Sequence, residues 1–311
     1  MKGISGIRHV VYGHTDLKAA ERFLVDFGLQ PAARTDNRIY FRGASSKSYV
    51  YVAQLEDTSG FRGLAFEADS IDVLKRLADT PGASKVEPID APGGGHRVVL
   101  HDPDGFRIEL VHGVPEVEPL PMREPLLLNY ARAKNRHGGT QRAPLGPAQV
   151  LRLGHVALTV SNFQRSLTWY REMLGMLPSD ILFDGSKDNH VGGFLRLDRG
   201  QEWVDHHTVA LFQSANSVAK PHHCSFEVQD LDAQALGNKW MLQQGHRHYW
   251  GIGRHVIGSQ IFDYWRDPGG NVIEHYADGD LLKADIPTGF AQASLDVLYQ
   301  WGPQVPQEFL D

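Results

Sequence analysis

The stretch RDPGGNVIEHYADG (Arg266–Gly279) has a near copy earlier in the chain, HDPDGFRIELVHG (His101–Gly113). In both, an Asp-Pro turn leads through a glycine into a short strand with one glutamate, Glu274 in the later copy and Glu109 in the earlier. A carboxylate in an otherwise apolar strand is costly to bury unless a partner neutralises it. The repeated turn therefore predicts a duplicated fold, and the two glutamates raise the question of what pairs with each.

The duplication extends to the rest of the chain, because a plan of strand, helix and further strands begins four times. The four opening strands are RHVVY (8–12), RGLAF (62–66), GHVAL (154–158) and HHCSF (222–226). One such unit cannot bury its apolar face alone, so the four are expected to pair. We predict an α+β fold in which two paired units make each of two domains.

The domain boundaries follow from where periodicity is lost. We predict a first domain over residues 1–113, a proline-rich linker over 114–150, a second domain over 151–280 and a tail of mixed loop and short helix over 281–311. In the second domain, Asn162 is expected to begin a helix that ends at Gly175.

Composition excludes several classes of protein. The 311 residues are 41% hydrophobic and 22% charged, with a formal net charge of −6, which suits a soluble globular protein and does not suit a nucleic-acid binder. No apolar run is long enough to cross a membrane, and the first residues do not resemble a signal peptide. The one cysteine, Cys224, allows no disulfide within the chain and is expected in the core, so a cytoplasmic location is predicted.

Aligning the opening strands predicts a metal site. Their second positions are His9, Gly63, His155 and His223, and side chains that share a strand position share a face. The second domain therefore offers two imidazoles and the carboxylate of Glu274, the facial triad typical of non-haem Fe(II) oxygenases. The first domain has a glycine in place of one histidine, so we expect it to retain only a vestigial, structural copy.

The segments around this triad resemble a known family. GRH (253–255), YWRDPGG (264–270) and the glutamate that follows are similar to the signature of type I extradiol ring-cleaving dioxygenases, of the catechol 2,3-dioxygenase and dihydroxybiphenyl dioxygenase kind. The resemblance covers nearly the whole chain. It implies four βαβββ modules paired into two vicinal-oxygen-chelate (glyoxalase-like) domains. Asp263 departs from the family, which has an apolar residue before the tyrosine.

The resemblance also implies roles for single residues. The metal ligands match the same triad of the second domain, and His255 and Tyr264 match residues that contact the substrate and assist catalysis. The acid–base histidine falls in DHHTVAL (205–211), where the spacing favours His207 over His206 and strand alternation sends His206 to the other face. Trp250 is expected to bind substrate, with other aromatic residues around it. His246 and His248 are expected to be packed or solvated.

The predicted function is therefore cleavage of a catechol-type ring next to its vicinal hydroxyls, with O2, Fe(II) and a ring-opened semialdehyde product, in aromatic compound catabolism. Mn(II) remains an alternative metal. A glyoxalase-type isomerase or lyase and a non-enzymatic aromatic-binding protein of the same superfamily are the alternative functions. The resemblance implies a homo-oligomer, and the sequence leaves the identity of the catechol open.

Overall fold

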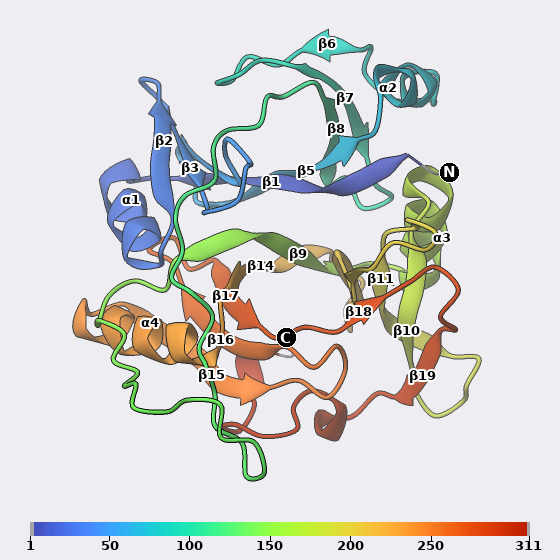
Figure 1. Ribbon diagram of the computed structural model, residues 1–311. Helices are drawn as coiled ribbons and strands as arrows, with labels where there is room; N and C mark the ends of the chain where they lie inside the picture. The colour runs from blue at the N-terminus through green and yellow to red at the C-terminus, as the bar shows by residue number, and fades with distance from the viewer. Residues whose placement is uncertain (1–2, 310–311) are drawn as a thin grey trace.

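Two mixed β-sheets, one above the other, make up the molecule (Figure 1). The computed structural model describes residues 3–309. The strands of the first sheet are β1 (Ile4–His14), β2 (Gln30–Arg34), β3 (Arg38–Arg42), β4 (Tyr51–Leu55), β5 (Gly60–Ala68), β6 (Glu87–Pro88), β7 (His96–His101) and β8 (Arg107–His112). Those of the second are β9 (Val150–Val160), β10 (Leu177–Phe183), β11 (His190–Arg196), β13 (Val209–Gln213), β14 (Lys220–Val228), β15 (Arg247–Arg254), β16 (Ile261–Arg266), β17 (Val272–Ala277) and β19 (Gly289–Gln292).

The two sheets have the same strand order. It is β2-β3-β4-β1-β5-β8-β7-β6 in the first and β10-β11-β13-β9-β14-β17-β16-β15 in the second, which adds β19 beside β10. In each sheet two units meet at a central antiparallel pair, β1 with β5 and β9 with β14. The predicted α+β class and the four paired βαβββ units are thus confirmed.

Each unit has one helix after its first strand. The helices are α1 (Leu17–Asp26), α2 (Ile71–Ala78), α3 (Phe163–Leu174) and α4 (Leu231–Gln243). The Asn162 side chain accepts a hydrogen bond from the backbone N–H of Arg165, and Gly175 ends α3 in the left-handed region at φ 69°, as expected from the sequence. Within residues 3–309, no helix is long and apolar enough to cross a membrane.

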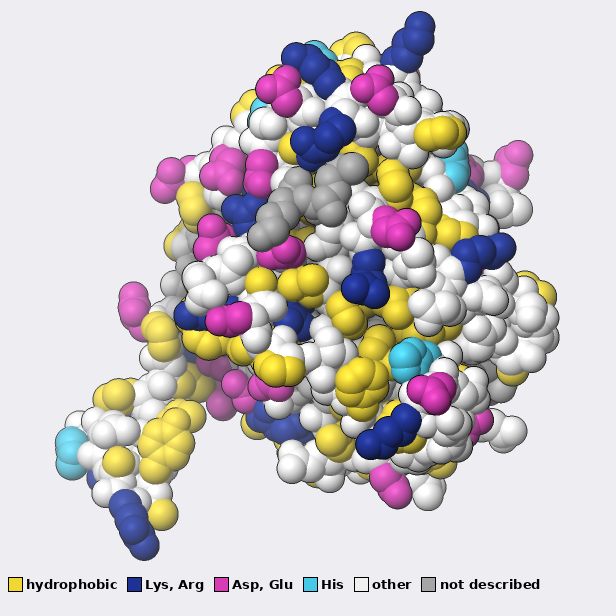
Figure 2. Space-filling model, turned by 90° about the vertical axis from the view of Figure 1, so that its right-hand side faces the viewer, with side chains coloured by type: hydrophobic (Ala, Val, Ile, Leu, Met, Phe, Trp, Pro, Cys, Tyr) yellow, Lys and Arg dark blue, Asp and Glu magenta, His cyan; other side chains and the backbone are white. Residues whose placement is uncertain are grey.

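The segment between the sheets forms no helix or named strand before β9 begins at Val150. It runs down one side of the molecule and extends beyond its lower end (Figure 1). Large apolar side chains are exposed there, including Leu127 and Tyr130. Elsewhere on the face seen in Figure 2, acidic and basic side chains are interspersed, without a basic stripe of the kind that binds nucleic acid.

The tail differs from its predicted mixture of loop and short helix, because it contributes two strands. β18 (Leu281–Leu282) pairs with β12 (Val204–Asp205), and β19 pairs with β10. Two short 3-10 helices follow, η1 (Leu295–Val297) and η2 (Gln307–Phe309). Strands of two and four residues are too short to produce an alternating pattern in the sequence. Residues 310–311, the end of the predicted tail, lie outside the described residues.

The two copies of the Asp-Pro turn explain why the sequence repeats this motif, since each turn contacts the opposite domain. Asp102 accepts a hydrogen bond from the Tyr170 hydroxyl at 3.2 Å, and Asp104 accepts one from the backbone N–H of Ser161 at 3.0 Å. In the other direction, Asp267 lies 4.0 Å from Nδ1 of His14. The turns therefore hold the two sheets together. The glutamates that follow them, Glu109 and Glu274, take no part in these contacts and are each buried within their own sheet.

Candidate metal centre and active site

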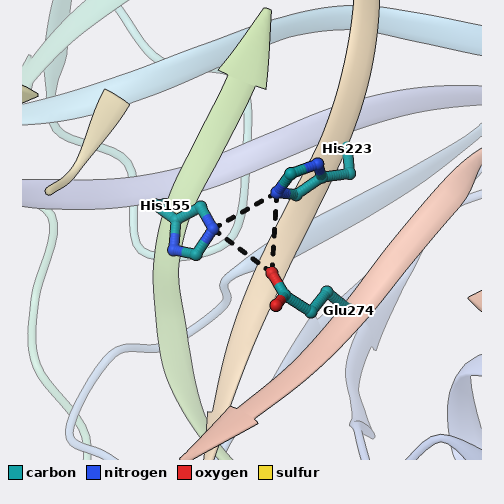
Figure 3. Close-up of side chains that lie close together, drawn as sticks. All are labelled: His155, His223 and Glu274. Carbon is teal, nitrogen blue, oxygen red and sulfur yellow. Dashed lines mark hydrogen bonds and ion pairs between the residues drawn. The ribbon is translucent and has the colours of Figure 1, made fainter. Parts of the chain in front are cut away.

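Three adjacent strands of the second sheet present His155, His223 and Glu274 to one another (Figure 3). His155 on β9 lies opposite Ser225 on β14, and Ser225 in turn lies beside Glu274 on β17. His223 is two residues before Ser225, so it faces the same side of the sheet. The shared register inferred from the repeat therefore brings the three side chains together.

The three side chains are close enough to share one cation. Nε2 of His155 lies 3.2 Å from Oε2 of Glu274 and 3.3 Å from Nε2 of His223, which is itself 3.5 Å from the same oxygen. Cis ligands about 2.1 Å from one ion lie roughly 3 Å apart. Glu274 is fully buried, and neither of its oxygens has a hydrogen-bond partner among the described residues. A buried carboxylate in this condition is costly without a positive partner, so the donor set fits a divalent metal.

His222, which precedes His223 on β14, orients the imidazole of His223. Its Nε2–H donates to the carbonyl of Phe309 at 3.0 Å, and its Nδ1 lies 2.7 Å from Nδ1 of His223. In that tautomer His222 Nδ1 accepts from His223 Nδ1–H, which leaves the lone pair of His223 on Nε2, facing Glu274. Partners of this kind fix the tautomer of a metal-ligating histidine.

Burial sets the charge state of the site. Desolvation lowers the pKa of His223 and His207 well below the usual value for histidine, so both are neutral near pH 7. Burial alone would raise the pKa of Glu274, but its contacts with His155 and His255 outweigh burial and hold that pKa well below its usual range. Neutral imidazoles beside an ionised carboxylate are the protonation states that metal binding requires.

His207, His255 and Tyr264 line the same small cavity, of about 50 Å³, as the two histidines of the triad. The ring of His207 lies 4.1 Å from that of His155, between centroids. Nδ1–H of His255 donates to the carbonyl of Leu298 at 2.5 Å, and its Nε2 accepts from the Tyr264 hydroxyl at 3.0 Å. All the residues implied as ligands or catalytic groups therefore meet at one place.

Comparison with known proteins identifies the group to which this site belongs. Residues 152–275 match the model of the Glyoxalase/Bleomycin resistance protein/Dioxygenase superfamily. The chain is 33% identical to metapyrocatechase 2 of Cupriavidus necator, over 99% of this chain and 92% of that protein. The chain belongs to the extradiol dioxygenase family.

Solved structures similar to this extradiol dioxygenase agree in fold. The homoprotocatechuate 2,3-dioxygenase of Brevibacterium fuscum superimposes with a TM-score of 0.79, at 20% identity over 99% of this chain and 92% of that one. A Mn(II)-bound glyoxalase of Novosphingobium aromaticivorans gives a TM-score of 0.80, at 23% identity over 100% of this chain and 95% of that one. The two-sheet fold is thus common to this dioxygenase and to both of these solved structures.

The expected substrate contact by Trp250 is corrected by the structure. Its ring stacks 5.5 Å behind Tyr264, between centroids, and its Nε1–H donates to the carbonyl of Pro303 at 2.9 Å. Trp250 does not line the cavity of the dioxygenase, because Tyr264 stands in front of it. Trp265 is likewise buried away from the site, where it donates to Asp263 at 2.8 Å.

Asp263, the residue that departs from the family pattern, is buried behind the tyrosine. Besides Trp265, it accepts hydrogen bonds from His248 at 2.8 Å and from the Asn238 amide at 3.0 Å. Three donors compensate its burial, and Asp263 is not among the described residues that line the cavity of the dioxygenase. His246 contacts Asp26 at 2.8 Å, and both of these histidines are packed, as expected.

The position of His206 differs from the one that strand alternation predicts. His206 and His207 lie between β12 and β13, outside either strand, and both are buried. Nε2–H of His206 donates to Asp180 at 2.7 Å, and its Nδ1 lies 3.0 Å from Nδ1 of His207. His206 is therefore a direct partner of His207, and the two rings lie 5.3 Å apart, between centroids, instead of on opposite faces of a strand.

The tail forms part of the cavity wall, which the sequence did not indicate. Val297, Leu298 and Phe309 line the cavity, and the Phe309 ring lies 5.0 Å from that of Tyr264, between centroids. Gln260, also missed, places its amide 3.4 Å from Nδ1 of His207. Scattered apolar residues in a tail without periodicity give no signal of where they will pack.

Proposed function

We propose that the second domain of this dioxygenase binds Fe(II) through His155, His223 and Glu274, and cleaves a catechol ring next to its two hydroxyls with O2. The product is a ring-opened semialdehyde. The observation that supports this most directly is the fully buried carboxylate of Glu274, which has the imidazole nitrogens of His155 and His223 at 3.2 and 3.5 Å and no cationic side chain of Lys or Arg paired with it among the described residues. A metal bound by three ligands on one side would bring the two catechol oxygens and dioxygen together.

His207 is suited to take a proton from the catechol. If His206 donates its Nε2–H to Asp180, its Nδ1 is left to accept from Nδ1–H of His207, and the lone pair of His207 is then on Nε2. A neutral imidazole with a free lone pair is a general base, and it returns the proton later as a general acid. Asp180 and His206 would hold this tautomer, as carboxylates do for catalytic histidines.

His255 and Tyr264 are suited to hold the substrate oxygens. The carbonyl of Leu298 fixes the tautomer of His255, whose Nε2 faces the Tyr264 hydroxyl. Burial raises the pKa of Tyr264 well above 10, so the tyrosine remains a donor over the working pH range. A substrate oxygen between these two groups would receive a hydrogen bond as negative charge develops on it.

The surroundings favour a catechol with an uncharged, apolar substituent. The metal pocket of about 50 Å³ is smaller than the roughly 150 Å³ cavity that holds a benzene ring. A second cavity of about 710 Å³ adjoins it across shared side chains, including Phe212, Leu298 and Phe309, and none of the described residues that line it is Asp, Glu, Lys or Arg. A substituent carrying a carboxylate would meet only neutral polar side chains there, such as those of Gln213 and Asn216, and no cationic partner among residues 3–309.

One experiment tests both the reaction and the substrate. The protein is loaded anaerobically with Fe(II) or Mn(II), its metal content is measured, and oxygen uptake is followed with catechol, an alkylcatechol and 3,4-dihydroxyphenylacetate. We expect stoichiometric oxygen uptake with a yellow ring-opened product, and the highest kcat/KM for the alkylcatechol. Bound metal without oxygen uptake on any catechol would favour the glyoxalase-type alternative. An equal kcat/KM for 3,4-dihydroxyphenylacetate and the alkylcatechol would contradict the proposed preference for an apolar substituent.

A further inference from the structure

The first domain contains a cavity of about 340 Å³ that the dioxygenase chemistry does not use. Residues of β1, β3, β4, β5, β7 and β8 line it, in the upper sheet of Figure 1. Tyr49 and residues 89–91, which include the carboxylate of Asp90, complete the wall. It contains His9 and Glu109, the counterparts of two metal ligands of the second domain. The cavity is therefore the first-domain equivalent of the metal pocket, and its volume is in the range of small-molecule sites.

Strand pairing gives the equivalences between the two pockets. Val11 pairs with Val52 in the first sheet as Ala157 pairs with Ala210 in the second. Counting from these pairs, Tyr49 occupies the position of His207. The Tyr49 ring lies 4.9 Å from His9, much as His207 lies 4.1 Å from His155, between centroids.

The same counting shows how the wall has changed from apolar to polar. Positions held by aromatic or small side chains in the second domain carry cationic, amide or phenolic groups in the first. Through matched pairing, Tyr40 replaces Phe194, Gln54 replaces Phe212, Arg38 replaces Gly192, Arg97 replaces Phe262 and Arg107 replaces Val272. The pocket has exchanged a metal ligand and an apolar wall for guanidinium groups and phenols.

Of the four arginines that line the cavity, Arg38 is the one whose charge is not paired with a carboxylate among residues 3–309. Arg97 and Arg107 hold Glu109, with contacts of 3.4 Å and 2.7 Å, and Arg62 is paired with Glu56. Arg38 donates through Nε to the neutral amide of Gln54 at 3.0 Å, and no carboxylate lies within ion-pair distance of it among residues 3–309. A guanidinium with free N–H groups at a cavity is suited to bind a carboxylate through two hydrogen bonds.

The other wall of the cavity is suited to a flat ring. Tyr40 and Tyr49 stand 5.2 Å apart, between centroids, and nearly perpendicular, which offers ring faces and edges to an aromatic group. His9 is 5% exposed, and its Nδ1 is buried without a hydrogen-bond partner among the described residues. An unsatisfied buried nitrogen of this kind needs a polar group to approach it.

We propose that the first-domain cavity is a binding site for a small aromatic carboxylate. Arg38 binds the carboxylate, Tyr40 and Tyr49 contact the ring, and His9 Nδ1 faces a polar substituent or water. This site is separate from the metal centre. The proposal can therefore be tested whether or not the second domain cleaves catechol rings.

Calorimetric titration of the Fe(II)-loaded protein with benzoate tests the site. We expect one benzoate per chain, and weaker binding of benzyl alcohol and of inorganic phosphate, since each lacks one of the two features that the cavity recognises. Arg38→Gln should weaken benzoate binding about tenfold or more, because it removes a charge-assisted pair, whereas Arg38→Lys should weaken it less. Arg132→Gln, which removes the same charge from the exposed linker, should change nothing.

Two further arms separate this cavity from the metal pocket. Arg38→Gln should leave ring cleavage and the melting temperature unchanged, and His223→Ala should leave benzoate binding unchanged. Loss of benzoate binding in His223→Ala, with retention in Arg38→Gln, would place the ligand on the metal and overturn the proposal. Absence of benzoate binding, or equal affinity for phosphate, would also overturn it.

Discussion

The two domains bury a glutamate at the same register and compensate it in different ways. In the first, Glu109 accepts hydrogen bonds from Arg107 at 2.7 and 2.9 Å, with Arg97 nearby. In the second, Glu274 has imidazole nitrogens of His155, His223 and His255 at 3.2 to 3.8 Å and no paired guanidinium among residues 3–309. The position of the carboxylate therefore belongs to the fold, while its positive partner decides the chemistry. Guanidinium groups complete the first site from within the chain, whereas the second requires an ion from outside.

Gly63 shows why the first site does not return easily to metal binding. A Cβ at this position, where the second domain has His223, would lie 2.9 Å from the Arg107 carbonyl and 3.2 Å from its Cβ. Its φ of 147° also disfavours any other residue. The space of the missing ligand is therefore occupied by the arginine that replaced it as the partner of Glu109.

Neutralising each glutamate should produce the largest difference between the two domains. Glu274→Gln should lose bound metal and nearly all activity, because a neutral amide cannot replace the anionic ligand. Glu109→Gln should keep metal and activity, and should cost about 1–3 kcal/mol of unfolding free energy because two guanidinium groups lose their charge partner. Elemental analysis, oxygen uptake and denaturant unfolding measure these effects. A Glu274→Gln protein that keeps its metal and its activity would contradict this assignment. Metal bound at Glu109 would also contradict it.

The acid–base position gives the next largest contrast. His207→Phe should retain metal and bind catechol but turn over roughly 10²–10⁴ times more slowly, the usual range for losing a positioned proton carrier. Tyr49→Phe, the same position in the first domain, should match the wild type in kcat. Single-turnover kinetics with preloaded metal measure both. If both variants keep wild-type turnover, the proton carrier lies elsewhere, with His255 the next candidate.

His206 should give a smaller effect, although strand alternation alone predicted none. His206→Ala removes the partner of Nδ1 of His207, and we expect kcat to fall about tenfold with metal content unchanged, as when outer partners of a site are lost. His206→Asn, which can still accept a hydrogen bond, should recover part of the rate. A His206→Ala protein slower than His207→Phe would exchange the roles assigned to the two histidines.

The smallest expected effect concerns the stability of one Asp-Pro turn. Burial raises the pKa of Asp102 to about 6, from 3.8. The folded state therefore holds its proton more tightly than the unfolded state, and this contribution to stability grows as the pH falls through 6 and is lost as it rises. Relative to Asp102→Asn, the wild type should gain about 1 kcal/mol between pH 7 and pH 5. Urea unfolding at both values measures this, and parallel pH profiles would refute it.

The sequence carried much of this information because the fold is repeated. Aligning four opening strands was enough to select His223 over His222 and to pair it with His155 and Glu274, since strand alternation is reliable inside a sheet. The same reasoning was wrong for His206, which lies outside the strands. It also missed Phe309, whose position depends on how an aperiodic tail folds back onto the sheet. Trp250 was predicted to contact the substrate because the sequence shows that a residue is aromatic but not that Tyr264 lies between Trp250 and the cavity.

The exchanged Asp-Pro turns have a consequence for how the protein unfolds. The hydrogen bond between Asp102 and Tyr170 spans 68 residues, and buried aromatic contacts such as Phe27 with Phe226 also cross between the sheets. One hydrophobic core includes residues of both sheets, so neither can melt without exposing apolar surface of the other. We therefore expect the two halves to unfold together, so that melting of the first sheet also disrupts the sheet that presents His155, His223 and Glu274.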